Sequence, residues 1–134
     1  MPDTVLIIMP VGSDPGYLDK TAAIDRAVAR AGLTATFPKY EPDDPRFQPY
    51  DFREQLQRAV VVLADLTGER PSCYFELGFA EALERPVQLI AQAGTPIHQT
   101  AYRRTVRFYA NTDELEQAVD QALSFARPIK AGSQ

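Results

Sequence analysis

The sequence predicts an α/β fold, in which helices cover both faces of a parallel sheet. Two observations support this prediction. Residues 4–9 and 60–65 form continuous apolar runs rich in β-branched side chains, which is typical of strands buried on both faces. Around these runs, apolar residues recur three and four positions apart, which is the spacing of amphipathic helices. Strands and helices that alternate in this way build a parallel sheet through right-handed crossovers.

Proline, glycine and capping residues indicate where these elements end. Pro10 cannot donate to a sheet ladder, and Gly32 is suited to the turn after the first helix. Ser72 is a candidate N-cap for the third helix and Asn111 for the last. We expect strands at residues 4–9, 33–38, 60–65, 87–91 and 105–109, and helices at 17–31, 50–58, 72–83 and 113–126. Five strands in so short a chain suit a flavodoxin-like three-layer sandwich with strand order 2-1-3-4-5.

Length and charge narrow the class of protein further. The 134 residues are expected to form a single domain, 1–134, with a frayed tail from about residue 127. The composition, 45% hydrophobic and 24% charged, is ordinary for a globular domain. The net charge of -4 argues against binding to a nucleic-acid polymer, which requires a basic surface.

The scarcity of cysteine and histidine excludes several kinds of site. One cysteine, Cys73, allows neither an intramolecular disulfide nor a cysteine-rich metal site, and we expect it to pack in the core. The single histidine, His98, is expected at the surface or behind the site rather than in catalysis. No apolar run approaches the ~20 residues of a membrane span, and no secretory leader is seen, so a cytoplasmic protein is expected.

Two loops are expected to meet at the carboxyl ends of the strands. In the order 2-1-3-4-5 the first and third strands are neighbours at the switch point, where open α/β sheets bind ligands. The loop after Met9 then faces the segment that carries Asp65 and Glu76. The residues expected opposite these two acids are Gly12, Ser13, Asp14 and Tyr17. The long loop 40–49, rich in proline and aspartate, is expected to close over the same site.

The segment after the third strand resembles a known family. Residues 64–68 read Ala-Asp-Leu-Thr-Gly, and after Pro71 residues 74–78 read Tyr-Phe-Glu-Leu-Gly. This pattern, with Met-Pro after the first strand, is similar to the nucleoside 2-deoxyribosyltransferase-like group. That group includes nucleotide N-glycosidases and TIR-like nucleotide-binding proteins. The resemblance implies an enzyme that cleaves or exchanges the N-glycosidic bond of a nucleoside or nucleotide.

The resemblance also implies roles for individual residues. Glu76 matches the glutamate that attacks the anomeric carbon of the sugar, and its place in the first turns of a helix is expected to favour the ionised form. Asp65 is expected to hold the nucleobase edge or assist its protonation as it leaves. The residues expected to bind substrate are Met9, Gly12, Ser13, Tyr17, Thr67, Gly68, Ser72, Tyr74 and Gly78. No metal and no cofactor is implied.

Other interpretations remain open. Relatives often carry Asn in place of Ser72 and Tyr in place of Phe75, which favours a non-catalytic nucleotide-binding or protein-interaction module on the same scaffold. TIR-like relatives use a helix-borne glutamate to cleave a nicotinamide dinucleotide, which is a further alternative. Without the resemblance, Glu76 would simply complement a helix N-terminus and Asp65 would cap a turn. In each case an exposed patch on the Glu76 helix is expected to bind a second copy, giving a homo-oligomer.

Overall fold

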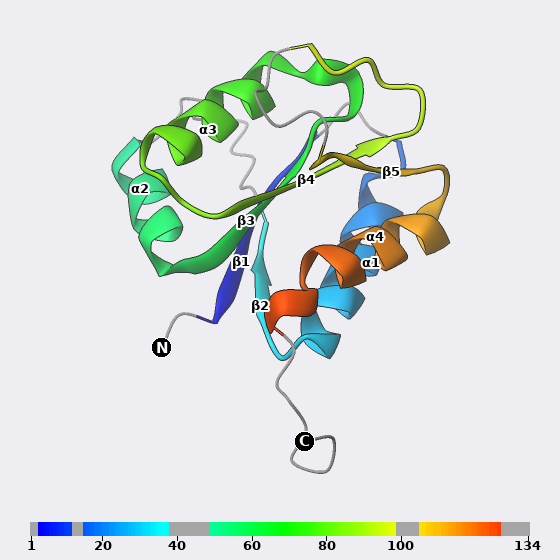
Figure 1. Cartoon of the computed structure of the whole chain (residues 1–134), viewed down its shortest axis with the longest axis horizontal. Coiled ribbons are helices and arrows are strands. Elements are labelled where there is room, and N and C mark those ends of the chain that lie inside the picture. Colours follow the sequence, from blue (N-terminus) through cyan, green and yellow to red (C-terminus); the bar gives the residue numbers. More distant parts are fainter. Residues whose placement is uncertain (1–2, 12–14, 38–48, 99–104, 127–134) are drawn as a thin grey trace.

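The computed structural model describes residues 3–11, 15–37, 49–98 and 105–126, and it has the predicted flavodoxin-like architecture (Figure 1). All strand pairs are parallel, and the sheet order is β2-β1-β3-β4-β5, as predicted. The strands are β1 (Thr4–Ile8), β2 (Thr34–Thr36), β3 (Ala59–Asp65), β4 (Val87–Gln92) and β5 (Arg107–Tyr109). The helices are α1 (Tyr17–Arg30), α2 (Pro49–Arg58), η1 (Thr67–Glu69), α3 (Pro71–Ala82), α4 (Thr112–Ala122) and η3 (Ser124–Ala126).

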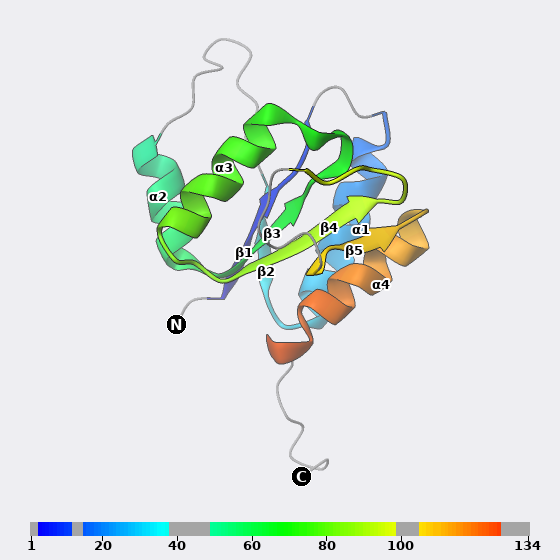
Figure 2. The ribbon, with the colours of Figure 1, turned by 45° about the horizontal axis from the view of Figure 1, so that its top comes forward.

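Helices cover both faces of the sheet. Figures 1 and 2 show α1 and α4 side by side on one face, and α2 and α3 on the other. The central strand β3 divides its side chains between the two cores. Val61 and Leu63 pack with α1 and α4, whereas Val62 and Ala64 pack with α2 and α3. This alternation explains why β3 reads as a continuous apolar run, because both of its faces are buried.

Most element ends follow the local chemistry, but the last helix, expected to reach residue 126, ends at Ala122 and is followed by the short helix η3. Gly32 has a φ of 76° just after α1, and the Asn111 side chain accepts the Glu114 N–H at 2.9 Å at the start of α4, both as predicted. The prediction that Ser72 caps α3 is wrong, because the helix begins one residue earlier. Pro71 occupies the first helical position, where its fixed φ is favourable and its missing N–H costs nothing.

Two of the predicted functional loops fall largely outside the described residues. Gly12, Ser13 and Asp14 after β1, and most of the loop expected at 40–49, are not described. The tail from residue 127 also lies outside the described residues.

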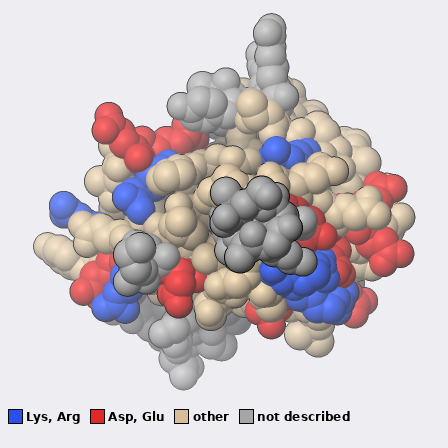
Figure 3. All heavy atoms as spheres, turned by 60° about the horizontal axis from the view of Figure 1, so that its bottom comes forward, with Lys and Arg blue, Asp and Glu red and all other residues tan. Residues whose placement is uncertain are grey.

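The visible surface carries charges of both signs. On the face shown in Figure 3, basic and acidic side chains lie among a larger uncharged area. Ion pairs join α1 to α4: Arg26 meets Glu116 at 3.0 Å, and Arg30 meets Asp120 at 3.0 Å. Every described helix is too short or too polar to cross a bilayer.

Candidate functional site at the carboxyl ends of the strands

Asp65, the last residue of β3, is completely buried and fully hydrogen-bonded. Its Oδ1 accepts the Thr67 hydroxyl at 2.6 Å and the Thr67 backbone N–H at 3.1 Å. Its Oδ2 accepts the Tyr109 hydroxyl at 2.8 Å. The Thr67 Oγ1 in turn accepts the backbone N–H of Gln92 at 2.8 Å. One carboxylate therefore links the ends of β3, β4 and β5 to the turn that follows β3.

Burial of the Asp65 carboxylate disfavours its charged form, and the surrounding hydrogen bonds offset only part of this effect. Burial raises the pKa of this carboxyl above its ordinary value, and hydrogen bonds from Thr67 and Tyr109 only partly offset that increase. The charge of Lys20 lowers the same pKa. Lys20 is itself buried, and its Nζ lies 5.5 Å from the centroid of the Tyr109 ring. Asp65 and its partners thus face the α1 and α4 side of the sheet.

The turn after β3 has an unusual backbone. Gly68 has a φ of 72°, which glycine adopts without cost, but Glu69 has a φ of 47°, which is unfavourable for a residue with a side chain. The Glu69 carboxylate accepts the Tyr74 hydroxyl at 3.0 Å and the His98 backbone N–H at 3.0 Å. The His98 Nδ1 lies 2.9 Å from Glu69 Oε2. These contacts fasten the turn to α3 and to the segment after β4.

The Glu69 carboxylate was not identified from the sequence. Burial raises its pKa, but the hydrogen bonds from His98 and Tyr74 outweigh that effect and hold the pKa below its usual value. An acid in a turn between Gly68 and Arg70 has no sequence signal that separates it from a solvated charge. Its partners lie 5 and 29 positions away, and only the fold brings them together.

Glu76 lies on the flank of α3 that faces α2. The core face of α3 is formed by Cys73, Leu77 and Ala80. Tyr74 and Glu76 are two positions apart, so their side chains leave the helix about 200° apart, one on each side of that core face. Tyr74 contacts Glu69, which is linked to the segment after β4. Phe79, three positions after Glu76, packs edge-on against Phe52 of α2, with ring centroids 5.6 Å apart.

The Glu76 carboxyl is half-buried, and burial raises its pKa to about 7. Within the described residues it forms no hydrogen bond and no ion pair that would offset this burial. The expectation that the helix N-terminus favours the ionised form is therefore wrong. Glu76 is in the second turn, beyond the free amides of the first turn, and the cost of burial exceeds the effect of the helix dipole.

Burial also sets the chemistry of Cys73, one turn before Glu76. Its side chain is 3% exposed, and burial, followed by the charges of Glu76 and Asp65, raises the pKa of the thiol to about 12. The thiol therefore stays protonated, which agrees with the expected role in core packing.

The structure separates the predicted site residues into distinct groups. Ser72 is exposed and lies one turn before Glu76 on the same flank of α3. Asp65 and Thr67 form the hydrogen-bonded junction on the α1 side, and Tyr74 is on the opposite flank of α3 from Glu76. Met9 is 3% exposed within the core, and Tyr17 packs against that core at the start of α1. Gly12 and Ser13 lie outside the described residues.

Gly78 is on the outer face of α3, away from the core. A Cβ added there would meet no atom of the described residues within 4 Å. Packing of α3 against the described part of the chain therefore does not require glycine at position 78.

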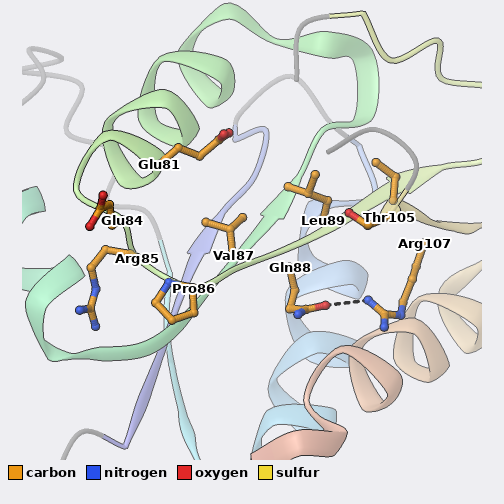
Figure 4. Close-up of a pocket in the computed structure, with 10 residues that line it drawn as sticks. Glu81, Glu84, Arg85, Pro86, Val87, Gln88, Leu89, Thr105 and Arg107 are labelled. Atoms are coloured by element: carbon orange, nitrogen blue, oxygen red, sulfur yellow. Dashed lines mark hydrogen bonds between the residues drawn. The ribbon is translucent and has the colours of Figure 1, made fainter. Parts of the chain in front are cut away.

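A cavity of about 860 Å³ lies at the other end of the sheet, where β4 begins (Figure 4). In it, Glu81 projects from α3, and Arg107 donates to the Gln88 side-chain oxygen at 2.7 Å. The residues that line the cavity are Glu81, Glu84, Arg85, Pro86, Val87, Gln88, Leu89, Thr105, Val106 and Arg107. None of the predicted site residues lines this cavity, so it is separate from the Glu76 flank.

Comparisons with known proteins give a match at the level of structure. A 2-deoxyribosyltransferase from the psychrotolerant bacterium Bacillus psychrosaccharolyticus superposes with a TM-score of 0.59 over 84% of this chain and 90% of that one, at 15% identity. The chain shares its fold with a 2-deoxyribosyltransferase. The constitutive lysine decarboxylase of E. coli matches with a TM-score of 0.50 and 11% identity, over 92% of this chain but 17% of that one. No protein-family model and no curated protein matches the sequence.

The likeness to the deoxyribosyltransferase agrees with the family resemblance predicted from residues 64–78 at the level of the fold. It covers most of both chains, so it concerns the whole domain rather than the central segment alone. The TIR-like part of the resemblance stays a prediction.

Replacing Tyr109 with Phe tests the junction at Asp65. The change leaves Asp65 Oδ2 buried without its donor, so we expect the free energy of unfolding to fall by about 1–3 kcal/mol. Urea denaturation of Tyr109→Phe measures this loss, with Tyr50→Phe as the control because Tyr50 is 83% exposed. Equal stability of the two variants would contradict the role given to the Tyr109 hydroxyl.

Replacing Glu76 with Gln tests the environment of its carboxyl. Because the folded-state pKa is about 7 against an ordinary 4.5, the protonated form is favoured in the folded protein. Wild type should therefore lose stability relative to Glu76→Gln as the pH rises from about 4.5 to above 7, by about 1–3 kcal/mol after solvent screening.

Denaturation of both proteins between pH 4 and pH 8 gives this difference. Glu54→Gln, at an exposed position of α2, is the control and should follow wild type across the whole range. A difference in stability between wild type and Glu76→Gln that does not change with pH would contradict the conclusion that burial raises the pKa of the Glu76 carboxyl.

Proposed function

We propose that this chain cleaves or exchanges the N-glycosidic bond of a nucleoside or nucleotide, with Glu76 as the nucleophile. The observation that carries the proposal is the half-buried Glu76 carboxyl, to which no described residue donates a hydrogen bond. It projects toward α2 from a helix that starts at the carboxyl edge of the sheet, where α/β folds bind ligands. The fold shared with a 2-deoxyribosyltransferase supports the same reaction class.

The desolvated carboxyl suits covalent catalysis. A carboxylate oxygen of Glu76 attacks the anomeric carbon, and the bond from that carbon to the base nitrogen breaks with its electron pair on the base. The product is a glycosyl ester of Glu76. Water or a second base then attacks the same carbon, and the ester bond breaks to restore the Glu76 carboxylate. The attacking form is ionised, so the reaction is favoured above the pKa of about 7.

In this proposal Asp65 acts by positioning rather than by contact with substrate. Its two oxygens accept hydrogen bonds from Thr67 and Tyr109, and the turn they hold leads directly into α3. The role that the family resemblance implies for Asp65, contact with the nucleobase as an anchor or proton donor, is the alternative to this positioning role. Ser72 is exposed on the same flank as Glu76, and it is the residue proposed to contact the sugar.

A nucleotide-binding module without turnover is the second candidate. Of the two departures from the family pattern, Ser72 lies on the Glu76 flank, whereas Phe75 is 59% exposed on the outer face of α3. The absence of an amide at Ser72 therefore favours this candidate, but the absence of a hydroxyl at Phe75 does not. The TIR-like alternative is cleavage of a nicotinamide dinucleotide. It would use the same glutamate, so only the identity of the substrate distinguishes it from the main proposal.

Base release from nucleosides, 2-deoxynucleosides, their monophosphates and NAD tests the proposal. We expect at least one compound to release its base, and Glu76→Ala to lower the rate about a thousandfold or more because the glycosyl ester cannot form. Chromatography of the released base gives the rate. Addition of a second free base shows whether the sugar is transferred or hydrolysed.

Glu81→Ala is the matched control. Glu81 lies on the same helix, and burial raises its pKa too, but it lines the cavity at the far end of the sheet. The control should keep the wild-type rate. Undiminished release by Glu76→Ala would contradict the assignment of the nucleophile. No release from any compound, together with a raised melting temperature on adding a nucleotide, would establish the binding module.

A further inference from the structure

We infer that residues 96–98 form a strap that opens and closes on the turn containing Gly94, and that the carboxylate of Glu69 holds the strap closed. The inference rests on the contacts and the backbone of these residues, and it does not depend on the proposed function. It adds a moving element to the carboxyl edge of the sheet, where α/β folds bind ligands.

The strap has little buried surface to hold it in place. Figure 1 shows the segment after β4, in yellow, returning toward the turn before α3. Pro96 and His98 are exposed, and Ile97 is partly buried against the core on the α2 and α3 side of the sheet. A segment with so few buried contacts is expected to open at a free energy below that of global unfolding.

A turn that is fixed to the sheet precedes the strap. The Ala93 N–H donates to the Tyr109 carbonyl of β5 at 2.8 Å. The Thr95 N–H donates to the Gln92 carbonyl at 3.1 Å and closes the turn. Within it Gly94 has a φ of 92°, which glycine adopts without strain. β4 and this turn can therefore stay in place while the strap moves.

Glu69 holds the strap through His98. The Glu69 Oε1 accepts the His98 backbone N–H at 3.0 Å, and His98 Nδ1 lies 2.9 Å from Oε2. An ionised carboxylate only accepts hydrogen bonds, so Nδ1 carries the proton and donates it. The Tyr74 hydroxyl, 3.0 Å from Oε1, joins the same carboxylate to α3. Opening the strap removes both His98 donors and leaves the carboxylate available to a ligand that carries hydrogen-bond donors.

The backbone of Glu69 is strained at the point where it holds the strap. Its φ of 47° is unfavourable for a residue with a side chain, and such a conformation persists only where surrounding contacts enforce it. Among the described residues that are not glycine, Glu84 also has a positive φ, 56°. The exposed Glu84 side chain makes no hydrogen bond and no ion pair with the described residues. The strain at Glu69 is therefore coupled to the strap, whereas the strain at Glu84 is not.

Hydrogen exchange of single backbone amides, measured by NMR, tests the strap. In wild type the His98 amide should exchange through a local opening that does not depend on low concentrations of urea. The Ala93 amide should exchange at a higher free energy that falls with urea. Glu69→Ala should speed exchange at His98 at least about tenfold, because its acceptor is lost. Glu84→Ala is the matched control and should leave exchange at His98 unchanged.

Glycine at the two strained positions separates the strain from the contact with the strap. Glu84→Gly relieves strain and loses no contact, so the melting temperature should rise by about 3 °C. Glu69→Gly relieves the same kind of strain but loses the contacts with His98 and Tyr74, so its melting temperature should not exceed that of wild type. Glu69→Ala keeps the strain and loses the contacts, so it should melt below Glu69→Gly.

Three results would overturn the inference. The first is a wild-type protein in which the His98 and Ala93 amides exchange at the same free energy, which would mean that the strap does not open by itself. The second is exchange at His98 that is unchanged in Glu69→Ala. The third is a melting temperature that rises as much in Glu69→Gly as in Glu84→Gly. The first comparison needs no variant, so it is decisive even where a variant is unstable.

Discussion

The hydrogen-bonded carboxylate of Asp65 is the interaction on which the carboxyl edge of this fold depends. A carboxylate buried without partners would be prohibitively costly, so the donors around it must stay in place whenever the protein is folded. Those donors belong to the turn after β3 and to β5, and Thr67 extends the contact to β4. The same turn delivers the chain to Pro71, where α3 begins. The junction therefore holds the turn from which α3 starts, and the buried Cys73, Leu77 and Ala80 orient the helix on the sheet.

Glu76 differs from Asp65 in its hydrogen-bond partners. Burial raises the pKa of both carboxyls, but Asp65 is surrounded by donors, whereas within the described chain no residue offsets the burial of Glu76. Carboxyls whose pKa is raised in this way are concentrated at functional sites. The two acids also belong to different layers, because Asp65 contacts β5 near α1 and Glu76 lies on the flank of α3 toward α2. In the proposed chemistry Glu76 therefore reacts with the substrate, and Asp65 holds the turn that leads into the Glu76 helix.

The sequence was sufficient to predict the architecture and to single out two acids, Asp65 and Glu76, near the central strand. Continuous apolar runs predicted buried parallel strands, and chain length predicted the strand order. The sequence was not sufficient for the surroundings of each acid. The Tyr109 hydroxyl bonds Asp65 across 44 positions, a contact that only the sheet order creates. The pKa of Glu76 was predicted in the wrong direction, because residue spacing shows the helix dipole but not the depth of burial. Glu69 gave no signal, and His98, although expected at the surface or behind the site, gave no indication that it contacts Glu69.

Direct detection of a glycosyl group on Glu76 is the measurement that tests the central claim. In 2-deoxy-2-fluoronucleosides the fluorine destabilises the positive charge that develops on the sugar in both steps, so an ester that has formed breaks down slowly. The account predicts a protein mass increased by one fluorinated sugar, with the group on the peptide that contains Glu76, and no increase for Glu76→Ala. Base release without any adduct, or an adduct on another residue, would contradict it.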